Sequence, residues 1–84
     1  MATEYMAINE LKEFDCNIYA SIKKIRNHHQ RADLESIYQE ITKTSSFEKL
    51  LKEHLAERLL FLTHNGNINN NKNRDKDSFQ INEI

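Results

Sequence analysis

The cations carry most of the chemistry this sequence can do, and four of them fall close together. Residues 16–32 contain no aspartate or glutamate, and they include Lys23, Lys24, Arg26 and Arg31. Because lysine and arginine neutralise phosphates and release counterions, such a block predicts contact with a nucleic-acid backbone. A solvated helix face would have the same composition, so the block alone leaves both interpretations open.

A second cationic group lies in residues 66–81, GNINNNKNRDKDSFQI. Its polar tip holds the residues that we expect to contact a duplex: Lys72, Asn73, Arg74 and Lys76. An arginine can donate to O6 and N7 of guanine, and lysines can contact phosphates. Asp75 and Asp77 add negative charge to the same tip, which opposes the approach of a phosphate.

Lys49 and Lys52 are two further candidate phosphate contacts, in the third of the helices expected below. The charges of that segment are mixed, whereas a helix that reads DNA is usually more basic. A solvent face crossed by ion pairs such as Glu48–Lys52, balanced by Lys49 and Arg58, is the favoured interpretation of the segment. We therefore expect the main DNA contacts to lie elsewhere.

Residue types that catalyse reactions or hold metals are few and unsuitably spaced. Cys16 is the only cysteine, and the histidines form one adjacent pair and two distant single residues. There is no CxxC or HxxxH spacing, no glycine-rich phosphate loop and no nucleophile elbow. The sequence predicts no enzyme activity, no metal and no cofactor, and Cys16 is interpreted as a small packing residue.

Length and composition set further bounds. Eighty-four residues with a net charge of −1 suit one small domain, and the single cysteine favours a reducing compartment. No apolar run approaches the roughly 20 residues that cross a bilayer, and the N-terminus lacks a signal peptide. We expect a cytoplasmic or nuclear protein with no membrane contact.

Apolar spacing predicts three helices that must position these cations. The first covers residues 18–29 and the second residues 34–41, with Asp33 as its N-terminal cap. The third reaches residue 62 from a capping box that Ser45 and Glu48 would form. We assign the aromatic residues of these helices to the core, Phe61 among them.

A hairpin should follow the third helix. Gly66, the only glycine, suits the left-handed position just past a helix end. Strands are expected at residues 67–71 and 78–82, with Ile68, Phe79 and Ile81 facing inward. Helices followed by such a hairpin predict a mostly helical α+β domain, a winged helix, over residues 16–84.

Residues 1–15 precede the winged-helix pattern. We expect them to form a short helical N-terminal arm. Its apolar side chains are Tyr5, Ile8, Leu11 and Phe14. They suit either docking on the domain or contact with a partner in a larger complex.

The order of these motifs resembles a winged-helix domain found in atherin-like SAM-domain proteins and in some MYST-type histone acetyltransferases. The resemblance rests on IKKIRNHHQRADLESI, LAERLLFLTHNGNI and NRDKDSF, and it covers residues 18–82. Members of that family bind duplex DNA with unmethylated CpG. Carried over by position, Asn73 and Arg74 would enter the major groove and Arg31 the minor groove. Arg74 replaces a usual lysine, and Asp75 replaces a usual glycine.

These observations predict a nuclear, duplex-DNA-binding module, and the resemblance implies a preference for CpG. It would act as a chromatin protein in transcription regulation or as the DNA-binding subunit of a DNA- or histone-modifying complex. The alternative is a winged helix that binds another protein as a scaffold subunit, without reading DNA. Near-zero net charge and the acids of the tip favour the alternative, whereas Arg31 and the cationic block favour DNA.

Overall fold

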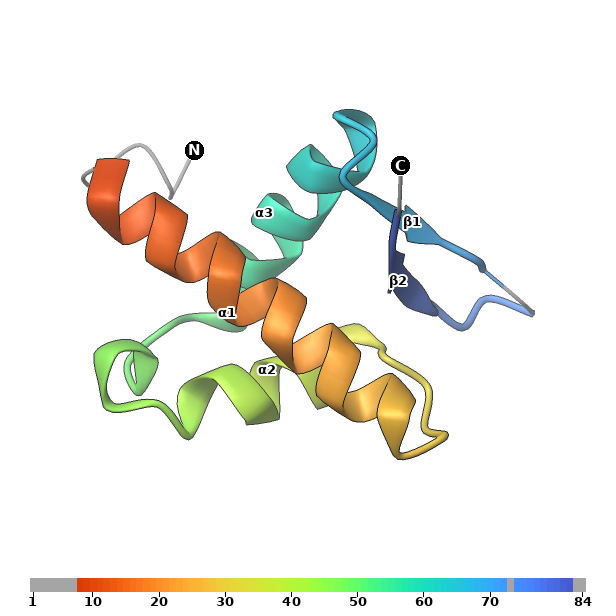
Figure 1. Cartoon of the computed structure of the whole chain (residues 1–84), viewed down its shortest axis with the longest axis horizontal. Coiled ribbons are helices and arrows are strands. Elements are labelled where there is room, and N and C mark those ends of the chain that lie inside the picture. Colours follow the sequence, from red (N-terminus) through yellow and green to blue (C-terminus); the bar gives the residue numbers. More distant parts are fainter. Residues whose placement is uncertain (1–7, 73, 83–84) are drawn as a thin grey trace.

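The computed structural model describes residues 8–72 and 74–82, and these residues form a small, mostly helical α+β domain (Figure 1). The helices are α1 (Ile8–Asn27), α2 (Leu34–Thr42) and α3 (Lys52–His64), with a short 3-10 turn, η2 (Ser45–Phe47), between the last two. The strands β1 (Ile68–Asn70) and β2 (Phe79–Ile81) pair antiparallel. The predicted class, helices followed by a two-stranded hairpin, is confirmed at this level.

Helix α1 is longer than expected, because it continues through the residues that we assigned to an arm. Phe14 is fully buried and extends the stripe formed by Ile18, Ile22 and Ile25 by one more helical turn. The boundary that we expected between residues 15 and 16 therefore falls inside one continuous helix. Leu11 is half-buried, and Tyr5 lies outside the described residues.

Helix α2 begins as predicted. The carboxylate of Asp33 accepts a hydrogen bond of 2.8 Å from the backbone N–H of Ser36, which satisfies one of the free amides of the first turn. Ile37 and Ile41 of this helix are buried in the same core as the stripe of α1.

Helix α3 begins at Lys52, so the predicted capping box of Ser45 and Glu48 is wrong. The reason is tertiary: Phe47 packs on Phe14, with ring centroids 5.4 Å apart, and the hydroxyl of Tyr38 donates to the Leu50 carbonyl at 2.6 Å. These contacts hold the chain in a 3-10 turn and an extended link, and Leu55, Leu59 and Leu62 then form the buried face of α3.

A left-handed turn at Gly66, with φ +79°, ends α3 as predicted. The N–H of Gly66 donates to the Thr63 carbonyl at 3.1 Å, and that of Asn67 to the Leu62 carbonyl at 3.0 Å. This pair of bonds is the Schellman arrangement, which satisfies carbonyls at the helix end. The chain then turns directly into β1.

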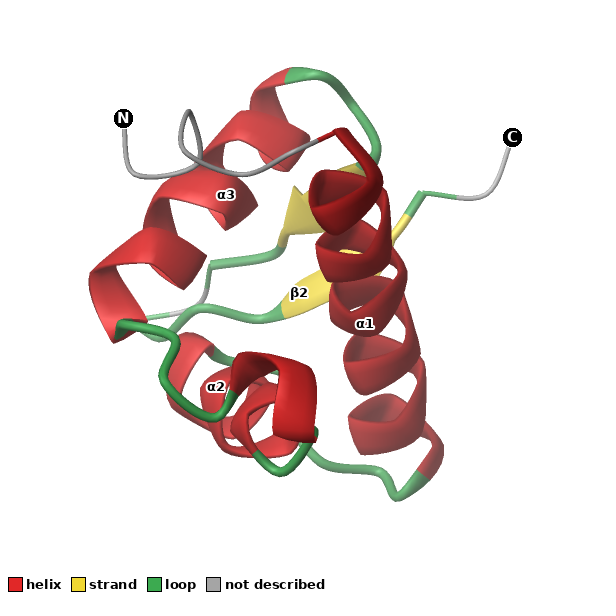
Figure 2. Ribbon diagram, turned by 90° about the vertical axis from the view of Figure 1, so that its left-hand side faces the viewer, coloured by secondary structure: helices red, strands yellow, loops and turns green. Residues whose placement is uncertain are grey.

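The hairpin lies between α3 and α1, with β1 on α3 and β2 on α1 (Figure 2). In its register Ile68 faces Ile81 and Asn70 faces Phe79. Ile68 and Phe79 are buried as predicted, and Ile81 packs on the core while half-buried. The N–H of Phe79 also donates to the Ala32 carbonyl at 2.8 Å, which ties β2 to the link between α1 and α2.

The turn at Gly66 gives a prediction about stability. A Cβ placed on Gly66 meets no atom within 4 Å, so Gly66→Ala tests the backbone conformation alone. We expect this change to lower the free energy of unfolding by about 1–2 kcal/mol, because alanine resists the left-handed region. Gly66→Asn is the matched control and should cost less, since asparagine adopts that region more readily. Urea denaturation measures both variants, and equal losses would contradict the argument.

Candidate functional site

The cationic block on α1 is divided between two sides of the helix. Lys23, Lys24 and Arg26 are all exposed, as expected. Lys23 and Arg26 line a shallow hollow beside Gln80 and Ile81 of β2. Lys24 instead points toward α2, where its Nζ lies 3.1 Å from a carboxylate oxygen of Glu40. The block therefore does not form a single phosphate-binding face.

A hollow of about 440 Å³ between the start of α2 and the hairpin tip brings three predicted DNA contacts together: Arg31, Lys52 and Lys76. The same hollow is lined by the carboxylates of Asp33, Glu35, Asp75 and Asp77. Acids outnumber bases here, so a phosphate entering the hollow would meet repulsion along with attraction. Sequence position alone could not indicate this mixture, because the residues come from three separate segments.

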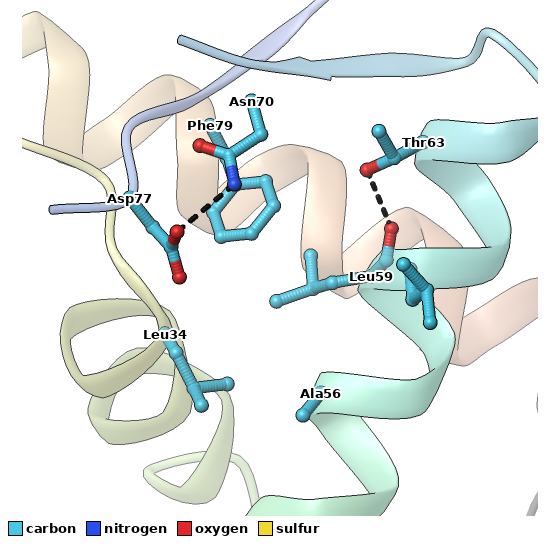
Figure 3. A pocket seen from close by; sticks show the side chains of 8 residues that line it. Leu34, Ala56, Leu59, Thr63, Asn70, Asp77 and Phe79 are labelled. Carbon is cyan, nitrogen blue, oxygen red and sulfur yellow. Dashed lines mark hydrogen bonds between the residues drawn. The ribbon is translucent and has the colours of Figure 1, made fainter. Parts of the chain in front are cut away.

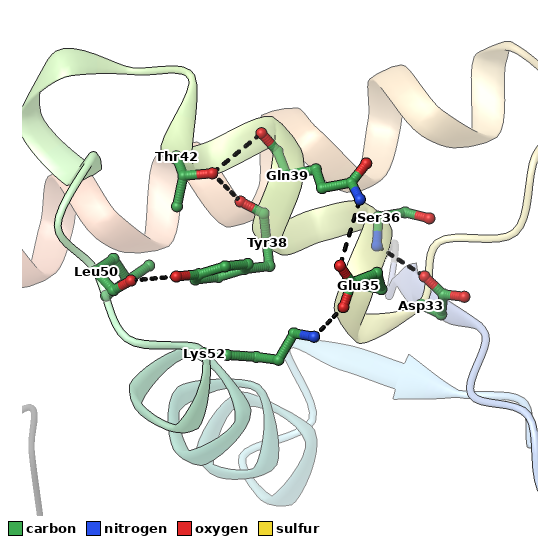
Figure 4. A network of polar contacts seen from close by, with 8 residues as sticks. All are labelled: Asp33, Glu35, Ser36, Tyr38, Gln39, Thr42, Leu50 and Lys52. Carbon is green, nitrogen blue, oxygen red and sulfur yellow. Dashed lines mark hydrogen bonds and ion pairs between the residues drawn. The ribbon is translucent and has the colours of Figure 1, made fainter.

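Lys52 is engaged within the domain. It forms an ion pair with Glu35 of α2, and its Nζ lies 5.8 Å from the centre of the Tyr38 ring (Figure 4). The hydrogen bond from Lys52 is the main cause that lowers the pKa of Glu35. The predicted Glu48–Lys52 pair is thus replaced by a pair between helices. Lys49 is exposed in the turn before α3.

The hairpin tip displays its cations to solvent. Lys72, Arg74 and Lys76 are exposed, and Asn73 lies outside the described residues. Arg74 and Asp75 both have left-handed backbones, with φ of 52° and 66°. Asp75 thus adopts a conformation that glycine favours.

Arg58 has a structural role that the sequence analysis did not predict. Its guanidinium makes two hydrogen bonds of 2.7 Å to the two carboxylate oxygens of Asp15, joining α3 to α1. The hydrogen bonds to Asp15 are the main cause that raises the pKa of Arg58. Both side chains are mostly buried, so Arg58 belongs to the helix packing and not to an open solvent face. Nearby, burial raises the pKa of Tyr19.

The outer side of α3 exposes apolar side chains that the sequence interpretation missed. Leu60 is 61% exposed, and Phe61, which we had assigned to the core, is 39% exposed. Both lie off the buried stripe of Leu55, Leu59 and Leu62. That offset from the buried stripe could have indicated their exposure. Phe61 also has a contact within the domain, since the guanidinium carbon of Arg58 lies 4.5 Å from the centre of its ring.

An apolar hollow of about 250 Å³ opens beside Leu60, between α3, the start of α2 and the hairpin (Figure 3). Its apolar wall consists of Leu34, Ala56, Leu59, Leu60 and Phe79. Asp77 lies at its edge, where its carboxylate accepts a 3.0 Å hydrogen bond from the side-chain amide of Asn70. A second hollow of about 240 Å³ lies along α3 and is lined by Glu57, Leu60, Phe61 and His64.

Within 8–72 and 74–82, no three histidine, cysteine, aspartate or glutamate side chains are grouped so that they could hold a metal ion. Cys16 is a free, exposed thiol, so its assignment as a packing residue is wrong. None of the described helices is long and apolar enough to cross a membrane.

Comparisons with protein-family models, with curated proteins and with solved structures find no match to this chain.

The charged hollow gives a prediction about pH. Burial alone would raise the pKa of Asp33, but the hydrogen bonds from Ser36 and the charge of Arg31 outweigh it and lower the pKa. A carboxylate whose pKa is lower in the folded protein stabilises the fold above its ordinary pKa, and this contribution is lost as the pH falls through the folded value. Asp33→Ala should therefore cost about 1 kcal/mol at pH 7, and less below about pH 4.

Asp33→Asn is the matched control, because asparagine caps a helix without ionising. It should keep much of the stability at pH 7 and remove the dependence on pH at this position. Urea denaturation at pH 7, 5 and 3 measures both variants. A difference between wild type and Asp33→Ala that stays constant down to pH 3 would contradict a contribution from the ionised cap.

Proposed function

We propose that this domain is a protein-interaction module whose binding surface is the outer side of α3. The observation that carries the proposal is Leu60, a large apolar side chain, 61% exposed, with an apolar hollow on each side. Exposed apolar surface that borders concave apolar surface is typical of a site covered by another protein. The domain would serve as a scaffold subunit in a larger complex.

The distribution of charge supports the same function. A helix that enters a DNA groove presents cations and polar donors, whereas the outer side of α3 presents Glu53, Leu60 and Phe61. Lys52 and Arg58, the lysine and arginine of α3, are held by Glu35 and Asp15.

We also propose that the fold is of the winged-helix type, and the order α1, α2, α3 and hairpin and the left-handed backbone of Asp75 support this. The connection between α2 and α3, residues 43–51, is longer than the roughly three to four residues that join the helices of a helix-turn-helix motif. This longer link also favours a role for α3 in binding a protein over insertion of α3 into a DNA groove.

Photo-cross-linking tests the protein-interaction function. With a photoreactive phenylalanine analogue in place of Leu60, irradiation in an extract of the source cells should yield an adduct sensitive to protease and not to nuclease. The same analogue in place of Gln39, an exposed residue of α2, is the control and should yield no such adduct. Leu60→Gln should abolish binding of the partner while changing the free energy of unfolding by only about 0.5 kcal/mol or less, because the side chain is exposed. Adducts that depend on nucleic acid at Leu60 would contradict the proposal.

Duplex DNA is the second candidate ligand, and the exposure of Lys72, Arg74 and Lys76 on one hairpin tip favours it. The hairpin extends to the edge of the molecule (Figure 1), and Arg31 lines the same hollow as Lys76. By the family resemblance, Arg74 would read the major groove and Arg31 the minor groove. The domain would then act in the nucleus on chromatin, or as the DNA-binding subunit of a modifying complex.

Fluorescence anisotropy with CpG, methylated CpG and scrambled duplexes, titrated with salt, tests DNA binding. Arg74→Ala should lower the preference for the specific site by about 1–3 kcal/mol. Asp75→Asn should raise affinity for every duplex, because it removes a negative charge and keeps a residue that tolerates the left-handed backbone. Absence of binding at low salt, or no change with Asp75→Asn, would exclude this ligand.

A further inference from the structure

The two hollows beside Leu60 define what shape of partner the surface can receive. One lies between α3 and the hairpin and the other along α3 toward His64, so Leu60 stands between them. A partner must therefore place apolar side chains on both sides of Leu60. Side chains at i and i+3 or i+4 of an α-helix are separated by one turn, which suits two neighbouring depressions on a helical surface.

The charges around these hollows define the partner's chemistry. Asp77 lies at the edge of the first hollow, and Glu57 lines the second. Glu53 is exposed and precedes Ala56 by three residues and Leu60 by seven, so it shares their side of α3. His64 is the one titratable base that lines either hollow among the described residues. The guanidinium of Arg58 lies on the Phe61 ring of the second hollow but is paired with Asp15, and Lys52 is paired with Glu35. The rim is thus predominantly acidic.

An apolar centre with an acidic rim is complementary to an apolar stripe with basic flanks. A second copy of the chain would bring the acidic rims of two α3 helices together, which opposes self-association through this surface. Extended peptides that add to a sheet edge are also less suited, because the apolar wall is formed by α3 and α2 side chains together with Phe79.

From this complementarity we infer that the surface around Leu60 binds a basic amphipathic helix of a partner protein. The inference rests on the proposed protein-interaction function and names the class of its partner. Leucine-like side chains of the partner helix would enter the hollow beside Leu34 and Phe79. Lysine or arginine side chains on its flanks would face Asp77 and Glu53.

The test uses two model helices with the same apolar stripe, one with lysine and one with glutamate at every polar position. Fluorescence anisotropy with the whole chain should show that the leucine–lysine helix binds at least about tenfold more tightly than the leucine–glutamate helix. Leu60→Gln should weaken binding of the leucine–lysine helix about tenfold, which corresponds to the roughly 1.4 kcal/mol expected for an apolar anchor. Leu51→Gln is the matched control, because Leu51 is also exposed but lines neither hollow. It should leave binding unchanged.

A smaller effect is expected for the rim. Glu53→Gln should weaken the leucine–lysine helix about two- to threefold and reduce the dependence of binding on salt, as for an exposed ion pair. Circular dichroism establishes that each variant is folded.

Two outcomes would overturn the inference: equal binding of the two model helices, or equal effects of Leu60→Gln and Leu51→Gln. A wild-type dimer in sedimentation equilibrium that Leu60→Gln dissociates would also overturn it, since a second copy would then occupy the surface. If neither model helix binds while the cross-link from Leu60 to a protein persists, only the partner class is wrong. If that cross-link is absent too, the proposed function fails with it.

Discussion

The backbone turn at Gly66 is the constraint on which the interaction surface depends. Its left-handed φ reverses the chain at the end of α3 and sends β1 back along that helix. The hollow beside Leu60 has α3 as one wall and the hairpin residues Asn70, Asp77 and Phe79 as another. A different exit from α3 would remove the hairpin wall from the hollow that Leu34 and Phe79 line beside Leu60.

Prediction from the sequence succeeded where the determining interaction is local. Asp33 lies three residues from the amide that it caps, and Gly66 supplies its own backbone freedom. Strand alternation likewise placed Ile68 and Phe79 in the core. Prediction failed where distant residues decide: the start of α3 depends on the hydroxyl of Tyr38, which binds the Leu50 carbonyl from twelve residues away.

The candidate site was harder to predict, because the charges that are neighbours in the sequence are not the charges that are neighbours in the folded domain. Lys24 pairs with Glu40, and Arg58 pairs with Asp15, and each pair joins two helices. A count of cations over residues 16–32 records Lys24 but not its acidic neighbour. The exposure of Leu60 was missed for a similar reason. It depends on which face of α3 packs against the core, and that face is the one of Leu55, Leu59 and Leu62.

Asp77 connects the two candidate surfaces, since it lines both the apolar hollow beside Leu60 and the charged hollow beside Arg31. Its acidic character is unfavourable for a hairpin that only approaches phosphates, but it suits the rim of a surface that receives a basic helix. A helix bound beside Leu60 would contact the hairpin that carries Arg74. Binding at α3 and binding at the tip would therefore both involve the hairpin. A partner bound at one surface would restrict the conformations of the hairpin that are open to a partner at the other surface.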